Sequence, residues 1–163
     1  MKQIIITLAI FTYFGINSSI AADQSKNIIE FNQPEKFTDF SIHADRNEKD
    51  RLRLMDQLSG LMDELLSEMS NNTFNIMVND VDMSGRFEFN GRNNEFIRVI
   101  KESDRTRLEF SYVIFDSNGK QLTKGDANLT DRNPLTLKRL SKEYRDTNFG
   151  NEMKMFKNWV KNL

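Results

Sequence analysis

The run from Glu48 to Ser70 constrains the fold more than any other segment of the chain. Its apolar residues recur in steps of three and four, at Leu52, Met55, Leu58, Met62, Leu65 and Met69, with Leu54, Leu61 and Leu66 widening the stripe. This spacing is typical of an amphipathic helix that packs one face on a core. Asp45 and Glu48 have capping-box spacing at its start, and Asn71-Asn72 favours its end. The same spacing favours core packing of the methionines over a methionine-lined binding groove.

After this helix the apolar residues alternate with a period of two, as on half-buried β-strands. Phe74, Ile76 and Val78 share one face, and Val81 and Met83 continue one residue out of step, which predicts a bulge near Asn79-Asp80. Further strands are expected at residues 27–31, 95–102, 106–116 and 121–129. The sequence Asn118-Gly119 predicts a type I′ hairpin turn before the last of them, and the strands after the helix are expected in meander order.

Helical patterns return near the end of the chain. Asn133-Pro134 can open a short helix, and the run from Asn151 to Leu163 places Met153, Phe156, Val160 and Leu163 on one stripe. The fold class predicted is therefore α+β: a mainly antiparallel sheet of about five strands, with one long helix and a C-terminal helix packed on one face. Residues 23–163 are expected to form a single globular domain, since about 140 residues suit one core.

Residues 1–22 have the pattern of a secretory signal peptide. Lys2 precedes an apolar run from Ile4 to Ile16, which is shorter than the ~20 residues of a membrane span, and cleavage is expected near Ala21 or Ala22. The mature chain is therefore expected in the periplasm or the medium, without a transmembrane anchor. It has no cysteine, so it must be stable without disulfides, and thiol chemistry and cysteine metal sites are excluded.

The charge of the chain limits the class of partner. The formal charge is −1, and loss of Lys2 with the leader makes that of the mature chain −2. Such a nearly neutral chain is not expected to bind nucleic acid. A basic run of Lys138, Arg139, Lys142 and Arg145 is interpreted as a solvated helix face, with docking of an acidic partner or lipid head groups as the alternative.

Two stretches carry a resemblance to a known family: "PEKFTD" (Pro34–Asp39) and "DVDMSG" (Asp80–Gly85). With "RTRLEFSYVIFDSNGKQL" and the terminal "NWVKNL", they resemble DUF3016, a family of bacterial exported proteins catalogued as a domain of unknown function. The residues that match its motif are Phe37, Thr38, Asp39, Asp80, Asp82 and Gly85. The resemblance implies a small soluble envelope protein and no particular activity.

The segment "DVDMSGRFEFNG" has some features of a calcium loop. Counted from Asp80, it places Asp82 and Gly85 as an EF-hand does, but the twelfth position is Gly91 instead of a bidentate glutamate. A looser calcium site that stabilises the fold remains one alternative. The favoured interpretation is that both aspartates turn outward and either cap turn amides or pair with arginines such as Arg86, Arg92 or Arg98.

The chain offers no assembled catalytic set. His43 is its only histidine, and it could join Asp39 or Asp45 and a serine in a triad. The leading hypothesis is a non-enzymatic binding or interaction module of the cell envelope, with an envelope protein or polymer as its partner. An envelope-polymer hydrolase that uses Asp80, Asp82 or His43 is the second hypothesis. No cofactor and no metal ligand are predicted.

Overall fold

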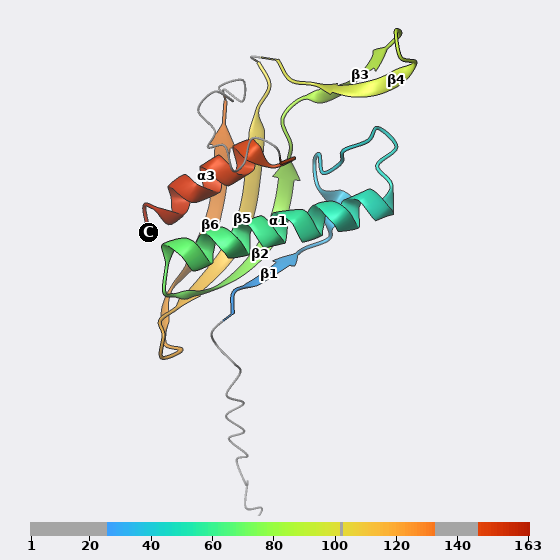
Figure 1. Cartoon of the computed structure of the whole chain (residues 1–163). Coiled ribbons are helices and arrows are strands. Elements are labelled where there is room, and N and C mark those ends of the chain that lie inside the picture. Colours follow the sequence, from blue (N-terminus) through green and yellow to red (C-terminus); the bar gives the residue numbers. More distant parts are fainter. Residues whose placement is uncertain (1–25, 102, 133–146) are drawn as a thin grey trace, which may run out of the picture.

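The long helix of the chain, α1 (Glu48–Met69), lies across one face of a four-stranded sheet (Figure 1). The computed structural model describes residues 26–101, 103–132 and 147–163. The side of α1 that faces the core consists of Leu54, Leu58, Met62, Leu65 and Leu66, each at most 1% exposed. The periodicity places Leu52 on this side as well, but Leu52 is 55% exposed because it lies about 120° around the helix from Leu58.

The cap of α1 differs from the predicted one. Asn47, and not Asp45, is the N-cap residue, and its Oδ1 accepts a hydrogen bond from the Asp50 amide (2.9 Å). Its Nδ2 donates to the Asp50 carboxylate in return (2.7 Å). The capping pair has the predicted spacing, displaced by two residues, but its second bond comes from the N-cap side chain and not from the N-cap amide of a capping box.

The main sheet has the strand order β1-β2-β5-β6. β1 (Ile28–Phe31) runs parallel to β2 (Thr73–Asp82), and β2, β5 (Thr106–Phe115) and β6 (Gln121–Asp131) are antiparallel neighbours. The register of β2 against β5 shifts between Val78 and Asp80, which confirms the predicted bulge. A short 3-10 turn, η1 (Pro34–Lys36), follows β1.

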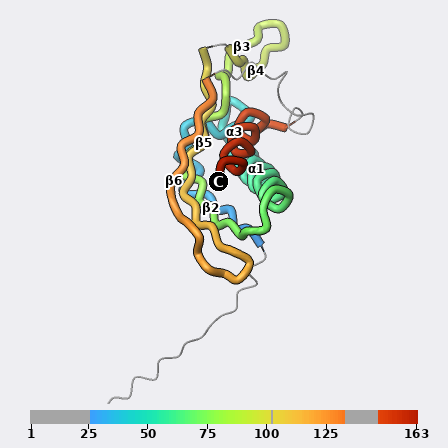
Figure 2. Tube along the Cα trace, turned by 90° about the vertical axis from the view of Figure 1, so that its left-hand side faces the viewer, coloured from blue at the N-terminus to red at the C-terminus, as the bar shows by residue number. Residues whose placement is uncertain are grey.

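The second helix of the core, α3 (Gly150–Val160), packs beside α1 on the same face of the sheet (Figure 2). Met153, Phe156 and Val160 are buried as their spacing predicts, whereas Leu163 is 57% exposed beyond the end of the helix. Trp159 lies edge-on to Phe110, with 4.8 Å between the ring centroids. The opposite face of the sheet is covered by no helix that the structure describes.

The two remaining strands leave the main sheet, which corrects the predicted meander. β3 (Arg86–Asn90) and β4 (Glu95–Val99) pair only with each other among the described strands, and they project from the body of the molecule (Figure 1). We call Arg86–Val99 the arm. None of its side chains belongs to the buried core. The described residues therefore form six strands in two sheets, and the predicted α+β class is confirmed.

The hairpin between β5 and β6 is confirmed, but its turn is not type I′. Only Gly119 of the Asn118-Gly119 pair has a positive φ, of 77°. The Asp116 side chain accepts hydrogen bonds from the amides of Asn118 and Lys120, both 2.9 Å long. This pattern is that of a three-residue loop closed by a glycine in the left-handed region.

Two predictions fall on undescribed parts of the chain. The helix after Pro134 and the basic run from Lys138 to Arg145 lie outside the described residues. Within the described ranges, no helix is both long and apolar enough to cross a membrane.

Candidate functional site

The two motif stretches, far apart in the sequence, lie side by side. Residues 37–39 continue along β2 beyond the end of β1, and Asp39 forms a parallel bridge with Asp82. The Asp39 amide donates to the Val81 carbonyl (3.0 Å), and the Met83 amide donates to the Asp39 carbonyl (3.0 Å). The sequence identifies both stretches but contains no signal that they touch.

The Asp80 carboxylate ties the first stretch to β5. Its Oδ1 accepts from the Thr38 amide (2.7 Å), and its Oδ2 accepts from the Thr38 hydroxyl (2.7 Å) and from Arg107 Nη2 (2.7 Å). The bulge after Val78 puts Asp80 and Val81 in step with their partners on β5 and leaves Val81 fully buried. The interpretation that the two aspartates cap turn amides or pair with arginines is therefore confirmed for Asp80, although its partner is Arg107 and not Arg86, Arg92 or Arg98. It is wrong for Asp82, whose carboxylate has no such partner among the described residues.

The Asp39 carboxylate holds Arg98 of the arm in a bidentate pair. The two hydrogen bonds, from Nη1 and Nη2, are 2.8 and 3.1 Å long, and the side chains are 14% and 17% exposed. The same guanidinium donates to the carbonyls of Ser41 (2.6 Å), Ser84 (3.2 Å) and Gly85 (3.3 Å). We call Asp39, Arg98 and these three carbonyls the clamp. It fastens β4 to both motif stretches.

Gly85 and Phe87 complete the base of the arm. Gly85 has a φ of 89°, and a Cβ added there would lie 2.6 Å from the Val99 carbonyl oxygen. Only glycine fits this close approach of the two strands without strain. The Phe87 ring lies 4.5 Å from the Arg98 guanidinium carbon, a cation–π contact that covers one face of the clamp.

Phe37 and Asp82 are the remaining motif residues. Phe37 is buried and packs on Phe40, with 5.5 Å between the ring centroids. Asp82 is half-buried, and no hydrogen bond from another described residue reaches its carboxylate. Burial raises the pKa of Asp82 above its usual range, and the neighbouring carboxylates of Asp39 and Asp80 act in the same direction, against Arg107.

The site predicted from the sequence omits Glu152, a buried acid on α3. Glu152 on α3 is 2% exposed and hydrogen-bonds to the Thr106 hydroxyl. Burial raises the pKa of Glu152 to about 7. Its neighbour Asn151 donates to the Ser84 hydroxyl (3.2 Å), so α3 contacts both the start of β5 and the segment before the arm. The spacing of four between Glu152 and Phe156 is the sequence signal that places this acid on the buried face.

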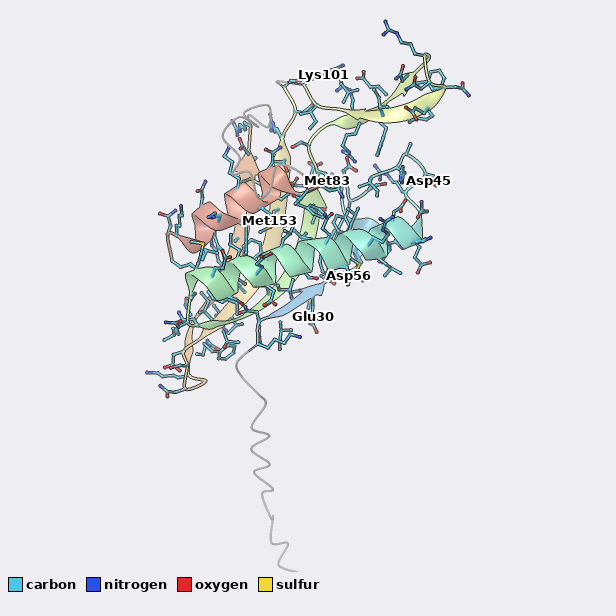
Figure 3. All side chains as sticks on the ribbon, viewed as in Figure 1. Glu30, Asp45, Asp56, Met83, Lys101 and Met153 are labelled. Atoms are coloured by element: carbon cyan, nitrogen blue, oxygen red, sulfur yellow. The ribbon has the colours of Figure 1, made fainter. Side chains whose placement is uncertain are left out.

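The outer half of the arm exposes apolar side chains. Phe89 is 58% exposed, Phe96 59% and Ile97 40%. Phe89 and Phe96 are cross-strand partners whose rings meet edge-to-face, with centroids 5.5 Å apart. Figure 3 shows that the two strands of the arm lie apart from the sheet and helices of the body.

His43 is not part of this site. Its side chain is 64% exposed, and its Nε2 lies 3.7 Å from the Asp50 carboxylate, so its partner is neither Asp39 nor Asp45. A shallow depression of about 650 Å³ on the uncovered face of the sheet is lined by Ile28, Met77 and Val113 among others, and by none of Asp80, Asp82 and His43. No group of three or more His, Asp or Glu side chains in the described ranges is arranged to hold a metal ion.

One comparison with known proteins found a match for this chain. No curated protein matches the chain. The model of the family described as "Protein of unknown function (DUF3016)" matches residues 25–162, a range that includes both motif stretches, the arm and both helices. The chain therefore belongs to the DUF3016 family.

Proposed function

We propose that the protein is an exported binding module of the bacterial cell envelope and that it contacts a partner protein through the arm. The observation that carries this proposal is the exposure of Phe89, Phe96 and Ile97 on an element whose base is clamped. A two-stranded hairpin is only marginally stable by itself in water. The clamp holds it in one position, which lowers the conformational entropy that a contact would cost.

The chemistry of the arm favours a protein partner. Its apolar centre is bordered by charged groups that already pair with one another: Glu88 binds Arg86 (2.9 Å) and Lys101 (2.7 Å). An aromatic centre within a polar rim is the usual composition of protein–protein interfaces. An anionic membrane would instead favour an excess of unpaired cations, and the formal charge of the chain is −1.

Photo-crosslinking in intact cells tests this proposal. A photoreactive amino acid at Phe89 or Phe96 should give a discrete adduct with another protein. The same amino acid at Glu64, which is exposed on α1, is the matched control and should give none. Recovery of only uncrosslinked chain from the two arm positions, or equal adducts from the control, would count against the proposal. Sedimentation of the purified chain with anionic vesicles, lost in Phe96→Ser, would assign the arm to the membrane instead.

One observation favours a second function, a hydrolase of an envelope polymer. The raised pKa of Asp82 suits a general acid, because such a group keeps its proton closer to neutral pH. The Asp80 carboxylate, in contrast, is engaged by Thr38 and Arg107. If the chain is a hydrolase, Asp82→Asn should abolish release of soluble fragments from isolated envelope polymer while the melting temperature stays near that of the wild type.

The calcium-stabilised fold is the third function considered. Asp80 and Asp82 have Arg107 as a neighbour, and its positive charge opposes binding of a cation. We therefore expect the melting temperature to be unchanged by millimolar calcium. A rise that is lost in Asp82→Asn would instead support a calcium site.

A further inference from the structure

The Thr106 hydroxyl lies between two acceptors but has only one hydrogen. Its Oγ1 is 3.2 Å from the Asp82 carbonyl oxygen and also hydrogen-bonds to Glu152 Oε1. When Glu152 is ionised, the hydroxyl can satisfy only one of these oxygens. When Glu152 is protonated, its own O–H donates to the Thr106 hydroxyl, and this hydroxyl donates to the Asp82 carbonyl oxygen. The hydrogen-bond chain from α3 to the end of β2 is then complete.

The surroundings of Glu152 determine when it takes up this proton. Thr106 is fully buried and Glu152 nearly so, and burial disfavours the carboxylate form. The charged groups whose fields act on Glu152 are Asp82 on β2, which opposes its ionisation, and Arg98 on β4, which favours it. Burial is the largest effect and raises the pKa of Glu152 to about 7, so its protonation changes near neutral pH.

We propose that protonation of Glu152 locks α3 to the base of the arm, and that its ionisation loosens the arm. An ionised Glu152 competes with the Asp82 carbonyl for the Thr106 hydrogen. Met83–Gly85 joins the Asp82 end of β2 to the arm, and its Ser84 hydroxyl accepts a hydrogen bond from Asn151 on α3 (3.2 Å). The arm is thus held firmly on the acid side of neutrality. Any effect on partner binding rests on the proposed function, but the lock does not.

Two measurements test the lock. The first is a ¹³C NMR titration of the glutamate side-chain carbons, with Glu152 assigned by the loss of its signal in Glu152→Gln. A midpoint near 7 is expected. A midpoint near the usual value of 4.5 would overturn the proposal.

The second measurement follows the arm itself. Because the chain has no cysteine, spin labels can be placed at Arg92→Cys on the arm and at Glu64→Cys on α1 without other changes. The distribution of distances between the labels should broaden from pH 5.5 to pH 8.5. In Glu152→Gln, whose amide can donate to Thr106 at both pH values, it should stay narrow. In Thr106→Val it should be broad at both.

An unchanged distribution in the wild-type chain would overturn the proposal, as would a pH-dependent one in Glu152→Gln. If a variant does not fold, the wild-type comparison at the two pH values still decides. The two proposals can be refuted independently. Crosslinking from the arm at a single pH tests the proposed function and does not depend on Glu152, whereas the NMR and spin-label measurements test the lock alone.

Discussion

At the scale of single residues, four of the six motif residues, Thr38, Asp39, Asp80 and Gly85, share one structural task. Thr38 and Asp80 fix the segment before the clamp to β2 and β5, and Asp39 receives Arg98. Gly85 permits the close approach of Val99 at the base of the arm. Each of these contacts joins segments that are distant in the sequence. These four residues therefore hold the arm on the body.

The close approach at Gly85 gives the first prediction. Gly85→Ala should lower the free energy of unfolding by about 2 kcal/mol or more, because it adds a left-handed φ penalty and a clash with the Val99 carbonyl oxygen. Gly60→Ala is the matched control. A Cβ at Gly60 meets nothing within 4 Å, and alanine should stabilise α1 by up to about 1 kcal/mol. Urea unfolding followed by the fluorescence of Trp159, the only tryptophan, measures both. Equal effects of the two substitutions would contradict the assigned role of Gly85.

The clamp gives the second prediction. Asp39→Asn removes the charge that neutralises a largely buried guanidinium, so it should cost about 2–4 kcal/mol of unfolding free energy. Glu88→Gln, which weakens two exposed pairs at the same arm, should destabilise the chain much less, because water and salt screen exposed ion pairs. The same urea titration measures both. If Asp39→Asn is no more destabilising than Glu88→Gln, the clamp contributes little.

At the scale of elements, the sequence predicts what local periodicity encodes. The spacing of neighbouring apolar residues predicts the buried face of α1, the alternation in β2 and the slip at Asn79-Asp80. The same spacing does not predict that β3 and β4 leave the main sheet, because the period of a strand does not say which strand it pairs with. The position of Glu152 beneath the arm depends on how α3 packs, and the spacing shows only that its face is buried.

The third prediction concerns pH and belongs to α3. The pKa of Glu152 is about 7 in the folded protein and about 4.5 in the unfolded chain, so the folded state binds more protons between these values. The contribution of Glu152 to the free energy of unfolding is then fully present below pH 4.5. It falls by about 3 kcal/mol as the pH rises to 7. The raised pKa of Asp82 acts in the same direction.

Urea unfolding at several pH values between 4.5 and 8 measures this slope. Glu152→Gln should flatten it and should be the more stable protein at pH 8. Asp116→Asn is the control, because the pKa of Asp116 is lowered by backbone hydrogen bonds in an exposed turn and its titration lies below this window. A wild-type slope that persists in Glu152→Gln would assign the effect to other groups.

The fourth prediction separates binding by the arm from its stability. Phe89→Ser with Phe96→Ser removes two exposed rings that bury little in the free chain, so the melting temperature should change by only about 2 °C or less. Adducts from a photoreactive group at Ile97 should nevertheless disappear in this variant. Phe110→Ser is the contrasting change: it removes a fully buried ring and should prevent folding. Retained adducts in the double variant would show that the aromatic pair does not contact the partner.

At the scale of the whole molecule, the fold divides its residues into two parts. The body has a continuous apolar core between one face of the sheet and the helices α1 and α3, which is sufficient without disulfides. The arm contributes nothing to that core and is held by polar contacts at its base. A stable body that presents a clamped aromatic hairpin is consistent with a protein that works by contact outside the cytoplasm, where the leader is expected to direct it.

The last prediction concerns that leader. The first described side chain with long-range contacts is Asn27, which hydrogen-bonds to Asp63 (2.9 Å) and to the Phe74 amide (3.0 Å). Asn27 lies after the expected cleavage site, so the mature chain keeps these two hydrogen bonds. We expect the intact mass of the chain recovered from the periplasm to correspond to cleavage after Ala21 or Ala22. Arginine at both positions should block cleavage, because the cleavage enzyme requires a small residue there. A periplasmic chain that keeps residues 1–20, or a chain found only in the cytoplasm, would refute export by a cleaved signal peptide.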